Sequence, residues 1–241
     1  ADAEIIIIDN ESREEETLQY LQDFASHPRR KVLAAPGPFN FSKLCNAGAR
    51  ESSARVLIFL NNDTTALAPD WVARLCDYAI RPECGAVGAR LLYPSGRVQH
   101  AGVAIGVGGY AGHVDLHIAG DVEGQFERAR RDHSLCAVTG ACLAVERTKF
   151  EAIGGFDEDN LPVDLNDIDL CLRLGENGWR TVYAAGAELV HHESASRGRK
   201  AATPRYRQEK AYFAARWRGA RRADPYFHPA LSLLLTRPSL G

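Results

Sequence analysis

The chain has 241 residues, of which 45% are hydrophobic and 25% are charged, with 29 Lys and Arg residues against 31 Asp and Glu residues. The net charge of −2 gives no electrostatic reason to expect nucleic-acid binding, and every apolar run is far shorter than the ~20 residues that a membrane-spanning helix needs. The six cysteines contain no C-x-x-C pair, which favours free thiols in a reducing cytoplasm over a disulfide framework or a zinc site.

Strand-like and helical patterns alternate over the first ninety residues, which predicts β-α-β units and a mainly parallel sheet flanked by helices. The unbroken apolar runs at residues 5–8 and 56–60 are expected to be strands covered on both faces. Helices are predicted with the acids at 14–16 in the first turn, from Ser42, and from Pro69-Asp70, with shorter strands at residues 31–33 and 86–89.

The second half of the chain changes character. Short apolar runs and glycines predict antiparallel β structure and loops over residues 91–120, followed by a charged loop over 121–134. Further on, the patterns predict strands at 141–145, 181–184 and 188–190, and helices at 148–153 and 166–177.

Residues 197–222 are basic, with Glu209 as the one acid among them, and Tyr206, Phe213 and Trp217 recur at helical spacing. This pattern favours an amphipathic helix that packs on the rest of the protein, and contact with an anionic membrane surface is the alternative. We therefore expect a main domain over residues 1–198 and a basic C-terminal helix and tail over residues 199–241.

Polar residues directly follow two of the predicted strands. Asp9 ends the first apolar run, and Asn61 and Asp63 follow the run at 56–60. Ligands of open parallel sheets gather beyond the carboxyl ends of the strands, and residues two apart on an extended chain share a side. Asp63 is therefore a candidate ligand for Mg²⁺ or Mn²⁺ with Asn61 as its neutral neighbour, and an ordinary turn of loop-forming residues is the alternative.

A second polar group lies at residues 164–169, where the helix over 166–177 is predicted to begin. Backbone N–H groups at a helix start stabilise a carboxylate, but capping explains one acid and not three. Among them, Asp169 is expected to be structural because it can pair with Arg173 one turn later. His191-His192 closes a predicted strand and could bring an imidazole to a metal.

Three familiar site types find little support. Asn61 occupies the position where aspartate-based phosphatases carry their nucleophile, and an amide cannot form the acyl phosphate. The chain contains no G-x-x-x-x-G-K-[ST] loop, and its glycines at 106–109 do not join a strand directly to a helix.

Seven short motifs in chain order resemble the family 2 glycosyltransferases of GT-A fold: Ile-Ile-Asp-Asn-Glu-Ser (7–12), Asn-Ala-Gly-Ala (46–49), Phe-Leu-Asn-Asn-Asp (59–63), Thr-Gly-Ala-Cys-Leu-Ala-Val (139–145), Gly-Gly-Phe-Asp-Glu (154–158), Asn-Asp-Ile-Asp-Leu-Cys-Leu-Arg (166–173) and His-His (191–192). Asn-Leu-Pro-Val at 160–163 and His-His-Glu-Ser-Ala-Ser-Arg-Gly at 191–198 resemble the bacterial, rhamnosyltransferase-like subgroup of O-antigen and surface-polysaccharide assembly. Members of the family begin with one further strand, so this chain, which contains no Met, is expected to lack that first strand.

The resemblance implies an α/β GT-A fold with a mainly parallel central sheet, flanking helices and a small antiparallel part. It also implies an inverting transfer from a UDP-, dTDP- or GDP-linked sugar to a glycan or lipid-linked acceptor, with Mg²⁺ or Mn²⁺ as the metal. Carried over by motif, the donor-side residues are Asp9 at the nucleobase, Asn46 near the nucleoside, Asn61 near the ribose, Asp63 at the metal and Gly140 by the donor sugar. Asp167 matches the catalytic base, and His191, with His192 a near-equal candidate, matches the histidine that reaches the metal or diphosphate.

Two other functions stay open at this point. One is a non-catalytic module of the same fold that binds nucleotide sugars or glycans, and the other is a nucleotidyltransferase with the same metal geometry. Because no signal peptide is present, we expect the protein in the cytoplasm, with the inner face of the membrane as a site of peripheral contact.

Overall fold

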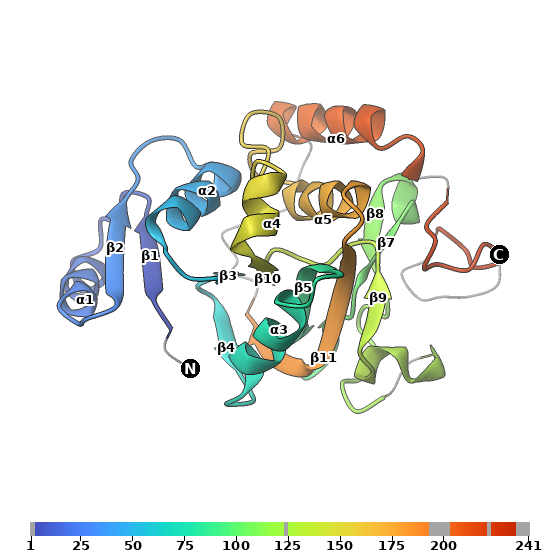
Figure 1. The fold of residues 1–241 in the computed structure, drawn as a ribbon, viewed down its shortest axis with the longest axis horizontal. Coiled ribbons are helices and arrows are strands. Elements are labelled where there is room, and N and C mark those ends of the chain that lie inside the picture. The colour runs from blue at the N-terminus through green and yellow to red at the C-terminus, as the bar shows by residue number, and fades with distance from the viewer. Residues whose placement is uncertain (1–2, 123–124, 193–202, 221–222, 235–241) are drawn as a thin grey trace.

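The computed structural model describes residues 3–122, 125–192, 203–220 and 223–234. The strands are β1 (Ile5–Asp9), β2 (Arg30–Ala34), β3 (Val56–Leu60), β4 (Thr64–Ala66), β5 (Cys84–Leu92), β6 (Val98–His100), β7 (Val103–Ile105), β8 (Ala111–His113), β9 (His133–Leu135), β10 (Cys142–Glu146) and β11 (Arg180–His191). The helices are α1 (Glu15–Ala25), α2 (Phe41–Glu51), α3 (Trp71–Ala79), α4 (Arg147–Ala152), α5 (Asn166–Glu176) and α6 (Pro204–Arg216), with 3₁₀ turns η1 (Val107–Gly109) and η2 (Gln125–Arg130) (Figure 1).

The strands form one large mixed sheet and two small ones. In the described part of the chain, the large sheet has seven strands, with the order β3-β10-β5-β11-β4 and with β6 and β9 paired to β5 and β11. Strands β3, β5 and β11 run in one direction, because β10 pairs antiparallel with both β3 and β5, and β5 pairs parallel with β11. Strands β1 and β2 form a separate parallel pair, and β7 and β8 an antiparallel one.

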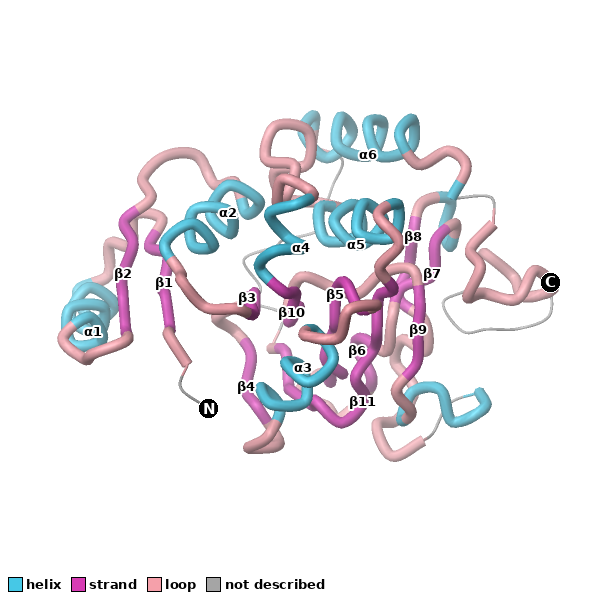
Figure 2. The backbone as a smooth tube through the Cα atoms, in the orientation of Figure 1, coloured by secondary structure: helices cyan, strands magenta, loops and turns pink. Residues whose placement is uncertain are grey.

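Helices cover both faces of the large sheet, which confirms the predicted α/β fold class. Helix α3 packs on one face through Leu75 and Ala79, which contact the buried side chains of β5 and β11. Helices α4 and α5 lie on the other face, and α6 lies outside α5 (Figures 1 and 2). Because both faces are covered, all nine residues of β5 are buried.

Several elements differ from the sequence expectation. Helix α2, which the sequence predicts from Ser42, begins at Phe41, and its N-cap is Asn40, whose side-chain oxygen accepts the Lys43 N–H at 2.9 Å. The predicted loop at 121–134 contains η2 and the first residues of β9. The last two predicted strands are one strand, β11, with a register shift after Ala184. Among the described strands of the main sheet only β5 and β11 pair parallel, so the sheet is mixed and not mainly parallel as predicted. Strand β10 enters between β3 and β5 from the opposite direction, and chain order cannot reveal such an insertion.

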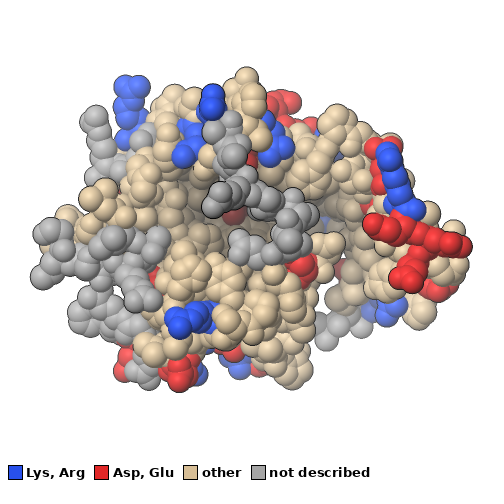
Figure 3. Space-filling model, turned by 180° about the vertical axis from the view of Figure 1, so that it is seen from behind, with Lys and Arg blue, Asp and Glu red and all other residues tan. Residues whose placement is uncertain are grey.

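Other expectations hold in the structure. All six cysteines are free thiols. Glu14, Glu15 and Glu16 lie on the surface at the start of α1, and Figure 3 shows carboxylates gathered at that end of the molecule. Among the described residues, no helix has the length and apolar character required to cross a bilayer. The predicted domain boundary between residues 198 and 199 falls outside the described residues.

Candidate active site

The turn after β3 places two polar side chains against one histidine ring. Strand β3 ends at Leu60, and residues 61–63 lead through a turn into β4. Because β4 pairs antiparallel with β11, Thr64 faces His191 across the ladder. His191 Nε2 lies 3.0 Å from Asp63 Oδ1 and 3.3 Å from Asn61 Nδ2. The two side chains therefore converge on one nitrogen atom, although they lie in a turn and not on a continued strand.

Gln99 of β6 determines which nitrogen of His191 faces Asp63. The Gln99 amide oxygen lies 2.6 Å from His191 Nδ1, and the Gln99 amide nitrogen lies 3.5 Å from the His191 carbonyl oxygen. Because an amide oxygen only accepts hydrogen bonds, Nδ1 carries the proton in the neutral ring and Nε2 presents its lone pair to Asp63. Gln99 is 6% exposed. Sequence reasoning missed this residue, because a single glutamine outside any motif gives no signal.

Asp167 lies in the first turn of α5 with both carboxylate oxygens held by backbone N–H groups. Oδ2 accepts the Gly140 N–H at 2.8 Å, and Oδ1 accepts the Ile168 N–H at 2.8 Å. A Cβ atom at Gly140 would lie 3.3 Å from Asp167 Cβ and 3.6 Å from the Phe41 ring. The absence of a side chain at residue 140 thus permits the close approach of the loop to α5.

A short backbone connection joins the histidine cluster to Asp167. The Asn61 N–H donates to the Ala141 carbonyl oxygen at 2.9 Å, and Ala141 directly follows Gly140. The β3–β10 ladder begins directly beside this hydrogen bond, where Leu60 pairs with Cys142. The turn that carries Asn61 and Asp63 therefore adjoins the Gly140-Ala141 segment, whose Gly140 N–H holds the Asp167 carboxylate.

Two predicted donor-binding residues lie apart from this cluster. Asp9 ends β1 in the separate two-stranded sheet, where its Oδ1 accepts the Ser12 N–H at 3.0 Å. Asn46 of α2 is 7% exposed. Its amide bonds to the backbone N–H and carbonyl oxygen of Phe156 and to the Glu158 carboxylate, each at 2.9 Å. In this structure Asn46 holds the turn that follows α4.

The structure distinguishes the two adjacent histidines. His192 is exposed, and its Nε2 lies 3.2 Å from Thr65 Oγ1, whereas His191 is the histidine beside Asp63. The predicted pairing of Asp169 with Arg173 is present, with Arg173 Nε 2.7 Å from Asp169 Oδ2.

Asp63 and His191 have the chemistry of a cation site. The Asp63 oxygen and the His191 Nε2 lone pair both accept, and they lie 3.0 Å apart, so a cation could bind to both. Within the described residues, no group of three or more His, Cys, Asp or Glu side chains is arranged to hold a metal ion. A divalent cation at Asp63 and His191 would therefore need further ligands from a substrate's phosphates or from water.

Comparison with known proteins identifies the family. The model of the family described as glycosyl transferase family 2 matches residues 1–154. The chain belongs to glycosyl transferase family 2. The matched segment of this family 2 chain contains Asp63 and Gly140, whereas Asp167 and His191 lie beyond it.

The family 2 chain has long bacterial relatives. It is 43% identical to the protein y4gI of Sinorhizobium fredii over 95% of this chain and 26% of that protein. It is 40% identical to the O-antigen biosynthesis protein RfbC of Myxococcus xanthus over 97% of this chain and 18% of that protein. The chain thus spans about a quarter or less of the length of these curated relatives.

A solved structure supports the fold. The crystal structure of GalNAc-T7 with UDP, GalNAc and Mn²⁺ superposes with a TM-score of 0.70 at 14% sequence identity, over 91% of this chain and 43% of that chain. At this identity the likeness concerns the fold, and it confirms the predicted GT-A class.

Proposed function

We propose that the chain transfers a sugar from a nucleoside-diphosphate donor to an acceptor hydroxyl, with Mg²⁺ or Mn²⁺ and with inversion at the anomeric carbon. One observation supports the proposal: the turn with Asp63, which lies beside His191, is hydrogen-bonded to Ala141, and the adjacent Gly140 N–H holds the Asp167 carboxylate. A group transfer needs one side of the site to stabilise the leaving group and the other to activate the attacking group. The two halves of this site suit those two tasks.

Asp63 and His191 would hold the divalent cation, with Nε2 of His191 oriented by Gln99. When bound, such a cation stabilises the negative charge that develops on a departing diphosphate. By family resemblance, Asn61 would lie near the ribose, Asp9 would bind the nucleobase, and Asn46 and Gly140 would lie on the donor side. Since the Asn46 amide is engaged by the turn after α4, we expect its influence on the donor to pass through that turn.

Asp167 would accept the proton of the acceptor hydroxyl as that oxygen attacks. The Gly140 and Ile168 N–H groups orient the two carboxylate oxygens, and each oxygen keeps a further lone pair for the incoming proton. A carboxylate held within hydrogen-bond reach of the hydroxyl contributes about 10²–10⁴-fold to the rate of such a step. Attack from the side opposite the leaving group inverts the anomeric centre.

We further propose a UDP-, dTDP- or GDP-linked donor and a glycan or lipid-linked acceptor in the assembly of a surface polysaccharide, with rhamnose as the first sugar to test. The Myxococcus xanthus relative, an O-antigen biosynthesis protein, supports the polysaccharide role, and the UDP and Mn²⁺ in the GalNAc-T7 structure support the donor class and the metal. A cytoplasmic location and contact with the inner membrane face stay predictions.

The test combines binding and transfer. Titration calorimetry with UDP, dTDP and GDP, each with Mn²⁺, should show binding of at least one nucleotide, and nucleoside-diphosphate release from the matching sugar donor should report transfer. Asp167→Asn should lose most transfer and keep nucleotide binding, whereas a non-catalytic module has no transfer to lose. Asp159→Asn, at an exposed position, is the matched control. Failure of all three nucleotides to bind, or full transfer by Asp167→Asn, would contradict the proposal.

A further inference from the structure

The basic helix α6 contains one acid, and that acid is buried. Glu209 is 1% exposed, in a helix that otherwise carries Arg205, Arg207, Lys210 and Arg216. Burial raises the pKa of Glu209, so a carboxylate at this position is costly unless its hydrogen bonds serve the structure. Its partners therefore show what α6 holds in place.

Glu209 binds the loop that leads into α5. Its Oε2 accepts the backbone N–H groups of two consecutive residues, Val163 at 3.3 Å and Asp164. Arg205, one turn earlier on α6, lies 3.0 Å from Glu209 Oε1 and 3.8 Å from the Asp164 carboxylate. Because the loop's backbone donates to a side chain of α6, the position of the loop depends on the docking of that helix.

The same loop is held from its other side by α2. Ser42 is fully buried, its Oγ donates to the Leu161 carbonyl oxygen at 2.5 Å, and its N–H donates to the Pro162 carbonyl oxygen at 3.1 Å. Asn166 Nδ2 donates to Ser42 Oγ at 3.0 Å. Between the loop and α5, Leu165 has φ 63°, a conformation that a non-glycine residue keeps only where its surroundings impose it.

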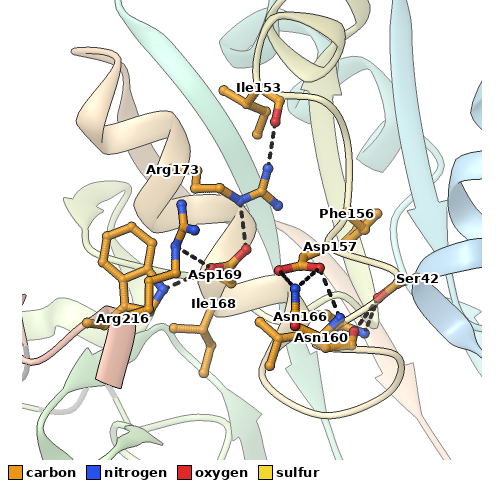
Figure 4. A network of polar contacts seen from close by, with 12 residues as sticks. Ser42, Ile153, Phe156, Asp157, Asn160, Asn166, Ile168, Asp169, Arg173 and Arg216 are labelled. Atoms are coloured by element: carbon orange, nitrogen blue, oxygen red, sulfur yellow. Dashed lines mark hydrogen bonds and ion pairs between the residues drawn. The ribbon is translucent and has the colours of Figure 1, made fainter. Parts of the chain in front are cut away.

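Helix α6 contacts α5 again on the other side of Asp167. Asp169 is fully buried, and its Oδ1 accepts the Trp217 Nε1–H at 2.9 Å. Arg216 Nε lies 3.4 Å from the same oxygen, and Arg173 donates to Oδ2. Figure 2 shows α6 running beside α5, and Figure 4 shows Asp169 between Arg173 and Arg216. Contacts from α6 therefore lie on both sides of residue 167 in the chain, at 163–164 and at 169.

We propose that α6 positions the base of the transfer reaction, with Glu209 as the positioning residue that sets the loop before Asp167. This inference rests on the proposed role of Asp167. Glu209 and Ser42 fix the loop, the loop imposes the conformation of Leu165, and Leu165 sets where α5 begins. The start of α5 then determines where the Asp167 carboxylate meets the Gly140 N–H. Loss of Glu209 should therefore misplace the base and leave the nucleotide and metal side intact.

The test compares kcat with nucleotide binding. With the UDP-, dTDP- or GDP-sugar that supports transfer, Glu209→Ala should lower kcat by about 100-fold, the order expected for a misplaced catalytic group. Calorimetric affinity for the matching nucleoside diphosphate with Mn²⁺ should be unchanged. Glu209→Gln keeps an oxygen that accepts both N–H groups and should restore most of kcat. Gln208→Ala, at an exposed position of the same helix, is the control and should match the parent chain.

A double variant distinguishes positioning from general stability. In an Asp167→Asn background, Glu209→Ala should cost no further transfer, because the group that it positions is already absent. If Glu209→Ala does not fold, Glu209→Asp is the substitute. It keeps the charge but moves the carboxylate away from the N–H groups of the loop, and it should still lower kcat. An unchanged kcat in Glu209→Ala or Glu209→Asp, or a further loss in the double variant, overturns the inference. Full transfer by Asp167→Asn would instead refute the proposed function itself.

Discussion

Replacing Gln99 by leucine tests whether this residue prepares His191 to bind metal. Leucine has a similar size but cannot accept a hydrogen bond from His191 Nδ1, which lies 2.6 Å from the Gln99 amide oxygen. Without that acceptor the ring is no longer held with the Nε2 lone pair toward Asp63. Loss of such a partner of a metal-binding histidine typically costs 10–100-fold in affinity, so we expect Mn²⁺ affinity to fall by about 1.4–2.8 kcal/mol.

The same substitution should also lower the stability of the fold, so the free energy of unfolding must be measured together with Mn²⁺ affinity. A buried N–H left without an acceptor costs about 1–3 kcal/mol, so the free energy of unfolding in urea should fall by an amount in this range. Mn²⁺ affinity is measured by electron paramagnetic resonance at a saturating concentration of the nucleoside diphosphate. The measurement uses only the folded fraction of the protein. Gln99→Glu keeps an acceptor and should bind Mn²⁺ at least as tightly as the parent chain, because a carboxylate makes the ring more basic.

Two histidine variants decide the outcome. His191→Ala should lose Mn²⁺ binding, and His192→Ala, whose side chain is exposed beside Thr65, should keep it. If Gln99→Leu binds Mn²⁺ as tightly as the parent chain while His191→Ala loses binding, the tautomer of His191 does not depend on Gln99, and the reasoning is refuted.

Three further predictions follow from single contacts. Gly140→Ala adds a Cβ atom 3.3 Å from Asp167 Cβ, so transfer should fall about tenfold or more without loss of folding, and an unchanged kcat would show that the carboxylate tolerates the shift. Asn46→Ala removes a buried amide with three 2.9 Å hydrogen bonds and should lower the free energy of unfolding in urea by about 2–3 kcal/mol, which a neutral result would disprove. Burial lowers the pKa of His100 and of His133 below 6.5, so the unfolded chain binds more protons than the folded chain at acid pH. Below pH 6.5 the free energy of unfolding should therefore fall by up to about 1.4 kcal/mol per pH unit for each histidine. A free energy of unfolding that does not change between about pH 7 and pH 5 would contradict this prediction.

The sequence predicts the main elements because the apolar runs and the polar strand ends are local signals. The apolar composition of residues 56–60 predicts a strand, and Asn61 and Asp63 are candidate site residues because they directly follow it. Which strand lies beside them depends on pairing with β11, which is more than a hundred residues away in the chain. The antiparallel insertion of β10 is equally a long-range choice, so the order of strands in the sheet could not be read from the sequence.

The predicted site residues show the same limit. Asp63 and His191 each had a local reason to be selected, and the structure brings them together. Asn46 was selected by resemblance alone, and its three hydrogen bonds to the turn after α4 depend on residues more than one hundred positions away. Gln99 had no signal at all. Glu209 did have a signal in the sequence, as the single acid of a basic stretch, but its role depends on the loop that packs against it.

Different structural elements hold the Asp63–His191 pair and Asp167, so we expect different mutations to affect each of them. Asp63 and His191 depend on the β4–β11 ladder, where a shift of one residue would turn His191 to the other face of the sheet. Asp167 depends instead on the start of α5, and therefore on how α2 and α6 hold the preceding loop. Changes in the ladder should thus act first on metal binding, and changes in α6 on the rate of transfer.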